Sequence, residues 1–158
     1  MTAKDIQVTK TRPANTTAYT VGDVINESAS AGTVWTFPTV GSAYKRGALI
    51  VNAKLLMGSA VATALDADLF LFTSSPTSGN DNGADTITNA EIKTCIGVVS
   101  FDTRLATAGQ SVYLATPNIQ CEFDGTTQNI YGVLIAQNAY VPINAEVFDI
   151  VLTTIALS

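Results

Sequence analysis

The chain consists of short segments in which apolar and polar residues alternate, separated by turns rich in glycine, proline, asparagine and serine. Alternation with a period of two is typical of strands that bury one face. Valine, isoleucine and threonine, whose branched side chains suit a pleated sheet, are abundant throughout. The pattern predicts strands at residues 5–9, 19–25, 33–37, 48–56, 67–73, 95–101, 111–115, 119–123, 129–137 and 146–155. Their spacing predicts an all-β fold, either a sandwich or a barrel.

Two of these segments also predict which faces are buried. Segment 66–72 is apolar on both sides, with Phe70 and Phe72 on one side and leucines on the other. A strand of this kind is central in its sheet or covered by another part of the chain. Segment 145–155 alternates more clearly. Its predicted core face is Glu146, Phe148, Ile150, Leu152 and Thr154.

Local turn signals add a hairpin and one helical turn. Asp124-Gly125 lies between two predicted strands and indicates a hairpin, which the following Thr-Thr-Gln lengthens. Thr88 followed by Glu91 matches a capping box and predicts a single helical turn at 89–93. A chain of 158 residues is one domain long. We expect an N-terminal arm and first strand at 1–18, followed by a single β-sandwich domain at 19–158.

The composition excludes several classes of function. The chain has no histidine, which removes Ser-His-Asp and Cys-His catalysis and every histidine metal site. Its net charge of −5 disfavours direct binding to nucleic acid. No stretch is apolar for about 18 residues, so no membrane span is expected, and the amino terminus lacks a secretory h-region, which predicts cytoplasmic synthesis. No cofactor or metal is expected.

The shortage of charge predicts that part of the surface is covered by other subunits. Charged residues make up 13% of the chain, against roughly 25% in ordinary soluble domains. Permanent interfaces are similarly depleted of charge. Positive charge is concentrated before residue 55, and a short basic arm there could reach an acidic neighbour. The candidate partner contacts are Lys4, Lys10, Arg12, Lys45 and Arg46. Alternatively, these charges are scattered and the arm is a frayed end.

Two sets of acidic residues are candidates for catalysis or for binding a metal ion. Asp66 and Asp68 would point to the same side of a strand, where paired carboxylates can do acid/base work or hold a cation. The alternative is a solvated strand end. The segment 80–85 resembles a calcium loop in composition, but its glycine is at the wrong position, which favours a surface turn.

Cysteines and aromatic residues leave further alternatives open. Cys95 and Cys121 are either reduced and buried or joined in a disulfide, and their spacing matches no zinc or redox motif. Trp35 and Phe37 lie on one side of a short strand. They belong to the core, or Trp35 stacks on a sugar or a base.

Three blocks of the sequence resemble small virion proteins of tailed bacteriophages. The opening TRPANTTAYTVGDVI at 11–25 is similar to a T-R-P-x-x-T-T-x-Y-x-x-x-D-V-I pattern in that group. The centre, with LFLFTSSPT at 69–77, Asp81-Asn82 and the segment 92–101, is similar to L-x-L-F-x-x-x-P, D-N and G-V-V-x-F. The segment AYVPINAEVF at 139–148 is similar to A-Y-x-P-x-x-x-E-x-F.

The resemblance implies a jelly-roll β-sandwich of about 8 to 10 antiparallel strands with at most one short helical turn. It also implies a non-enzymatic protein of the virion that decorates or cements the outer capsid surface. Its partners would then be the major capsid protein and copies of itself, with a homotrimer expected. One alternative is a glycan-binding jelly-roll module of a head fibre or tail component that uses Trp35. Another is a small hydrolase that uses Asp66 and Asp68.

Overall fold

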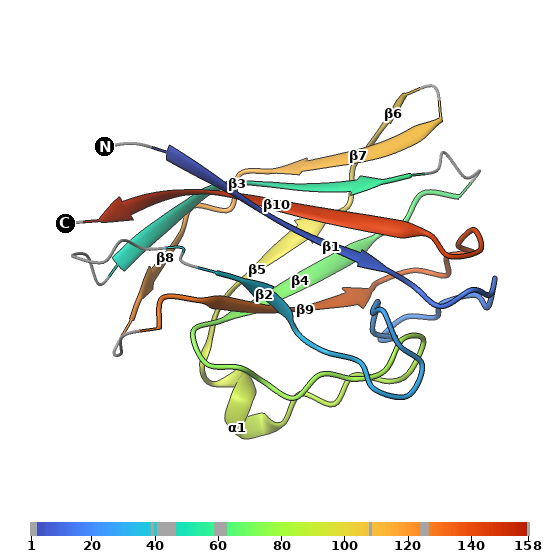
Figure 1. Cartoon of the computed structure of the whole chain (residues 1–158), viewed down its shortest axis with the longest axis horizontal. Helices are drawn as coiled ribbons and strands as arrows, with labels where there is room; N and C mark the ends of the chain where they lie inside the picture. The colour runs from blue at the N-terminus through green and yellow to red at the C-terminus, as the bar shows by residue number, and fades with distance from the viewer. Residues whose placement is uncertain are drawn as a thin grey trace.

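The computed structural model describes residues 3–38, 40, 47–58, 63–107, 109–123 and 127–157. Two antiparallel sheets pack face to face (Figure 1). The larger sheet contains, in order, β1 (Ala3–Thr11), β10 (Val147–Leu157), β3 (Gly47–Met57), β7 (Gln110–Ala115) and β6 (Arg104–Thr107), with β8 (Ile119–Glu122) also paired to β3. The smaller sheet contains β2 (Trp35–Phe37), β9 (Ile130–Ala136), β4 (Ala67–Phe72) and β5 (Cys95–Phe101).

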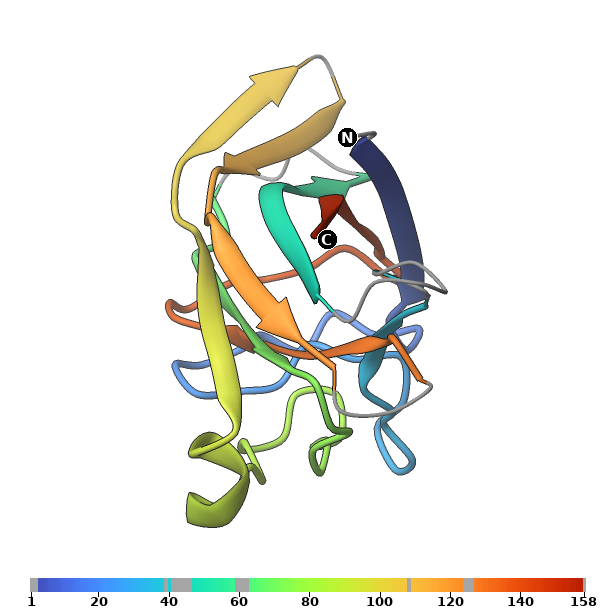
Figure 2. The same cartoon turned by 90° about the vertical axis from the view of Figure 1, so that its left-hand side faces the viewer.

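The pairing of the strands is that of a jelly roll. β1 pairs with β10, β2 with β9, β3 with β7 and β8, and β4 with β5, all antiparallel. Nested pairs of this kind arise when one long hairpin is rolled into two layers. Figure 2 shows the two layers from one end, with the β6–β7 hairpin extending beyond them. The predicted all-β, jelly-roll-like sandwich is therefore confirmed.

The core lies between the inner faces of the two sheets. On β10, Phe148, Ile150, Leu152 and Thr154 are buried, as is Glu146 just before the strand. The face predicted from the alternation of this segment is therefore confirmed. The inner face of β4 adds Ala67, Leu69 and Leu71 from the opposite sheet. Burial of these side chains supplies the main driving force for folding.

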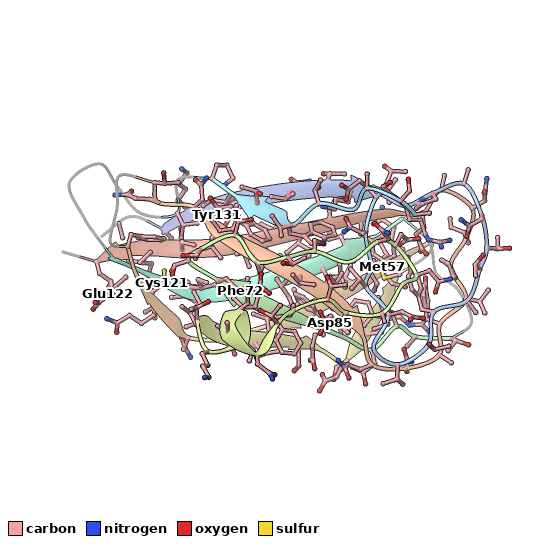
Figure 3. The ribbon with its side chains drawn as sticks, turned by 90° about the horizontal axis from the view of Figure 1, so that it is seen from below. Met57, Phe72, Asp85, Cys121, Glu122 and Tyr131 are labelled. Carbon is pink, nitrogen blue, oxygen red and sulfur yellow. The ribbon has the colours of Figure 1, made fainter. Side chains whose placement is uncertain are left out.

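The outer face of the smaller sheet is covered by two long connections, residues 12–34 and 73–94, which we call the loop layer (Figure 3). A second apolar cluster lies beneath it, formed by Val24, Phe72, Val133 and Ile135. The connections pair with each other, since Val24 N donates to Gly83 O at 2.8 Å and Asn82 N donates to Val24 O at 2.9 Å. Because the loop layer covers the outer face of the smaller sheet, β4 is covered on both sides, which explains why it is apolar on both faces.

The only helical piece in the described part of the chain is α1 (Asn89–Ile92), within the loop layer. Its N-cap is Thr88, and Thr88 and Glu91 form the predicted capping box. Glu91 also accepts hydrogen bonds from the backbone nitrogen and the hydroxyl of Thr77 at 2.6 and 2.8 Å. One carboxylate therefore joins the turn to the preceding loop. In the described residues, no helix has the length and apolar character needed to span a membrane.

Glu91 predicts an acid transition confined to the loop layer. Hydrogen bonds from Thr88 and Thr77 lower its pKa from 4.5 to about 2. Because the folded-state pKa is depressed, its stabilising effect is full above the unfolded pKa and is lost as the pH falls through about 2. We expect the amide protons of Thr77 and Thr88 to titrate together near pH 2 in NMR spectra, and Glu91→Gln to abolish that titration. A midpoint near 4.5 would show that these bonds are absent in solution.

One predicted strand does not form in the structure, and one observed strand was not predicted. Residues 19–25 form only isolated bridges, Tyr19 with Tyr140, Asp23 with Ala84 and Val24 with Ile135. A turn interrupts this segment. Thr20 donates hydrogen bonds to the Asp23 carboxylate, and Gly22 has a φ of 93°, a conformation that residues with a side chain disfavour. Strand β6 was not predicted. The predicted Asp124-Gly125 hairpin lies outside the described residues.

Candidate functional site

The candidate acid/base pair, Asp66 and Asp68, lies half-buried at the start of β4. Ser100 Oγ donates to the Asp68 carboxylate at 2.6 Å. Burial raises the pKa of Asp66, and the nearby charges of Asp68 and Asp102 raise it further. Across the residues that the structure describes, no three His, Cys, Asp or Glu side chains are arranged to hold a metal ion.

Lys10, a candidate partner contact, points into the protein from β1 and is 8% exposed. Its ammonium group donates to Asn26 Oδ1 at 2.7 Å, to the Glu27 carboxylate, and to the carbonyl and hydroxyl oxygens of Thr33. It also lies 5.3 Å from the centre of the Trp35 ring. Burial lowers the pKa of Lys10, while the bond and charge of Glu27 oppose that shift. Four groups of the loop layer and β2 therefore surround one buried cation.

Arg12, immediately after β1, is more deeply buried and pairs with Asp81. Its Nη2 lies 3.2 Å from Asp81 Oδ2, and its Nε donates to the Tyr19 hydroxyl at 3.0 Å. The Tyr19 hydroxyl and the backbone nitrogen of Asn26 both donate to Asp81 Oδ1, at 2.5 and 3.0 Å. Burial and the neighbouring Asp81 raise the pKa of Tyr19 far above its usual value, so the hydroxyl keeps its proton.

A second carboxylate extends this network. The rings of Tyr19 and Tyr140 stack with their centres 6.4 Å apart. The Tyr140 hydroxyl lies 3.0 and 2.9 Å from the two carboxylate oxygens of Glu146, which is fully buried. The backbone closes the network, because Arg12 N donates to Glu146 O at 3.0 Å. We call the side chains of Lys10, Arg12, Tyr19, Asn26, Glu27, Asp81, Tyr140 and Glu146 the polar cluster.

The polar cluster corrects part of the expected partner surface. Lys10 and Arg12 are held by carboxylates of their own chain, so they are not free to reach an acidic neighbour. The physical reason is visible in the alternation of β1, which places Lys10 on the inward face with Ile6, and Arg12, one residue beyond the strand, continues the same alternation. Lys4 is exposed, and its contact with a partner stays a prediction. Lys45 and Arg46 lie outside the described residues.

Sequence reasoning missed Asp81, because the segment around it has the composition of a surface turn. Asp81 is 6% exposed and is the acceptor for Arg12, Tyr19 and Asn26. Two buried cations at the end of β1 require partners, since an unpaired buried charge is costly. The need of these cations for anionic partners was visible in the sequence, but it does not identify the carboxylate that pairs with each of them.

Trp35, the candidate stacking residue, belongs to the core. It is 1% exposed and is part of the main apolar cluster between the sheets. Its indole nitrogen donates to Ile25 O at 3.4 Å. The alternative in which Trp35 lies in the core therefore holds, and its ring is not accessible to a glycan in this structure.

The two cysteines are free and lie in different apolar clusters. Cys121 packs in the main core, whereas Cys95 packs against the cluster under the loop layer. The smaller sheet separates these clusters, so a disulfide between the cysteines would require a rearrangement. Burial raises the pKa of the Cys121 thiol to about 11. A thiol in this state is a poor nucleophile, and it acts as a small apolar side chain.

The remaining surface of interest is the outward side of the larger sheet, which we call the open face. None of the described residues lies over it, in contrast to the loop layer on the opposite side of the sandwich (Figures 1 and 2). Leu105 on β6 and Leu114 on β7 are 50% and 51% exposed there, and Val147 on β10 is 37% exposed. Exposed apolar groups on a sheet face mark contact surfaces more often than isolated exposed residues do.

The chain is similar in structure to chains of two solved phage capsids. No protein-family model matches the chain, and no curated protein matches it. A chain in the solved capsid of Ralstonia phage GP4 is similar over 99% of this chain and 84% of that chain, with 16% identity and a TM-score of 0.46. A chain in the capsid asymmetric unit of cyanophage Pam1 is similar over 96% of this chain and 82% of that chain, with 16% identity and a TM-score of 0.38. Likenesses at this level do not carry a function over to this chain.

Proposed function

We propose that this chain is a non-enzymatic structural protein of a tailed-phage virion that decorates and stabilises the outer surface of the capsid. The observation that carries the proposal is the convergence of the three sequence blocks that resemble such proteins. Arg12 and Tyr19 from the first block, Asp81 from the second, and Tyr140 and Glu146 from the third all belong to the polar cluster. Residues that are far apart in the sequence thus form one buried network.

The open face supports a role in binding rather than chemistry. It presents exposed apolar side chains on β6 and β7, Leu105 and Leu114, and apolar groups of this kind are common in permanent contact surfaces. A protein that binds only the assembled shell stabilises that shell by mass action. Many copies on a repeating surface add to this effect through multivalency. No reacting group is needed for such a role.

Net charge favours a place on the outside of the shell. With a net charge of −5, the chain would be repelled by packaged DNA. The major capsid protein is therefore the expected partner, met from the outside. The homotrimer implied by the sequence resemblance stays a prediction.

The test is binding to virions prepared from a phage genome that lacks the coding sequence. We expect the purified chain to co-sediment with these particles to a saturating copy number, and electron cryomicroscopy to show added density on the outer surface. The particles should also withstand heating better with the chain bound than without it. The same chain unfolded by heat and cooled in denaturant serves as the control. Absence of saturable binding, or density only inside the shell, would contradict the proposal.

A further inference from the structure

The loop layer contains the one asparagine-glycine pair of the sequence, Asn82-Gly83. Asparagine is a thermolabile residue, because its side-chain amide can be converted to a carboxylate by deamidation. A glycine at the next position favours this reaction, since it has no side chain to hinder attack by its own backbone nitrogen. Asn82 also has a φ of 55°, in the left-handed region that asparagine tolerates better than most residues. Asn82 is therefore the asparagine of this chain with the least hindered nucleophile beside it.

Asn82 lies where the two connections of the loop layer are joined. Asn82 N donates to Val24 O at 2.9 Å, and Val24 N donates to Gly83 O at 2.8 Å. The next bond along the same junction runs from Asp81 N to Ser28 O at 2.7 Å. A chemical change at Asn82 therefore acts on the backbone bonds that hold the two connections together.

The side-chain amide of Asn82 faces two acceptors of the other connection. Its nitrogen lies 3.0 Å from Ala18 O and 3.1 Å from Asp23 Oδ2, and it donates to both. Asp23 Oδ2 also accepts from the backbone nitrogen and the hydroxyl of Thr20, which are neutral donors. A carboxylate in place of the amide would face a carbonyl oxygen and another carboxylate, and neither can donate to it.

We propose that Asn82 is a site of spontaneous deamidation, which reacts when the loop layer opens and whose product keeps the layer from closing. In the first step, Gly83 N loses its proton and bonds to Asn82 Cγ. The side-chain nitrogen leaves as ammonia, and a five-membered imide remains. Water then opens the imide at one of its two carbonyl groups. The product is aspartate or isoaspartate at position 82, and no oxidant or cofactor is consumed.

The folded turn holds both reacting groups in hydrogen bonds. Gly83 N donates to Asn80 O at 3.1 Å, so its proton is engaged, and the Asn82 amide is bonded to its two acceptors. Attack requires these bonds to break, and those of Asn82 break when residues 80–83 separate from residues 18–24. The rate of deamidation in the folded chain therefore depends on how often the loop layer opens.

Either product opposes closure of the layer. Aspartate places a second negative charge beside Asp23 and removes the donor to Ala18 O. Isoaspartate adds one methylene carbon to the main chain, so the backbone bonds on the two sides of Val24 no longer match their partners. A layer that stays open uncovers the apolar cluster on the outer face of the smaller sheet.

The first experiment measures the rate of deamidation at Asn82. The purified chain and a synthetic peptide of residues 78–87 are incubated in the same buffer, and peptide mapping by mass spectrometry follows the replacement of the amide by an acid. We expect the folded chain to react at least tenfold more slowly than the peptide. Arg12→Met removes the partner of the neighbouring Asp81 and should speed the reaction at least tenfold. Its matched control is Lys4→Met, an exposed cation of the same strand, which should react as the wild type does.

The second experiment tests whether the product keeps the layer open. Asn82→Asp reproduces one product, and we expect the amide of Val24 to exchange its hydrogen at least tenfold faster than in the wild type. Amides of β3 and β10 should be unchanged, which separates opening of the layer from loss of the fold. Asn82→Gly accepts the same φ and adds no charge, so it should raise the exchange less. Adding Asp23→Asn to Asn82→Asp removes one of two facing charges and should restore part of the protection.

Three results would overturn the proposal: a folded chain that reacts at Asn82 as fast as the peptide, deamidation confined to other asparagines, or an Asn82→Asp variant whose loop layer exchanges as the wild type does. These measurements use the purified chain alone. The proposed virion function is measured separately by particle binding, so either proposal can fail without the other.

Discussion

Replacing Arg12 by methionine should lower the free energy of unfolding by about 3–5 kcal/mol, the cost typical of leaving a buried charge unpaired. The side chains of Arg12 and Asp81 are 0% and 1% exposed, so water cannot replace the guanidinium group. The substitution also removes the donor to the Tyr19 hydroxyl. Urea unfolding followed by circular dichroism measures the loss, which is a large share of the stability of a typical domain.

Two further variants separate the lost charge pair from lost packing. Adding Asp81→Asn to Arg12→Met removes the unpaired charge while keeping an oxygen for Tyr19 and Asn26, so part of the stability should return. Lys4→Met removes an exposed cation from the same strand and should change stability by no more than about 0.5 kcal/mol. If Arg12→Met proves as mild as Lys4→Met, the ion pair with Asp81 does not form in solution.

Replacing Trp35 by alanine should also cost about 3–5 kcal/mol, as expected when a large aromatic side chain is removed from a core. Trp35 is 1% exposed, packs between the sheets and lies beside the Lys10 ammonium group. Its loss therefore leaves a cavity and removes a favourable neighbour of a buried cation. Because Trp35 is the only tryptophan, unfolding must be followed by circular dichroism rather than by tryptophan fluorescence.

A conservative variant and a glycan-binding assay show whether Trp35 acts through packing in the core or through binding a ligand. Trp35→Phe keeps most of the ring volume and loses the weak bond to Ile25 O, so it should cost clearly less than alanine. A glycan-binding role makes the opposite prediction, in which Trp35→Ala abolishes binding on a glycan array while stability stays near that of the wild type. That result would show that the Trp35 ring is exposed, and it would contradict the placement of Trp35 in the core.

The alternation of apolar and polar residues predicted strands that have one face in the core and the other face toward solvent. β10 was predicted nearly to the residue, because a buried face and a more polar face alternate along most of the strand. β5 was predicted from its run of apolar and β-branched residues. The capping box of α1 was predicted because Thr88 and Glu91 interact locally. β6 was missed because it has four residues at a sheet edge, where pairing with β7 decides its conformation rather than its own pattern.

The polar cluster could not be predicted because its partners come from distant loops. Asp81 approaches Arg12 only after residues 73–94 fold back over the smaller sheet, and no periodic pattern records that path. The inward position of Lys10 was implied by the alternation of β1, but the identity of Glu27 as its partner was not. For the open face, the sequence predicted a shortage of charge, while the position of that face depended on the order of the strands.

The antiparallel register between β1 and β10 has a consequence for how the chain acquires its fold. Ala3 is level with Ile155, and Thr153 Oγ1 donates to the Asp5 carboxylate at 2.6 Å. A ribosome adds about 5–20 residues per second, so the earliest strand emerges seconds before the strand that will flank it. Until then its apolar side chains lack their native cover, and chaperone binding would be most useful in that interval. Closing so long a loop also predicts folding in milliseconds to seconds, as for other chains dominated by nonlocal pairing.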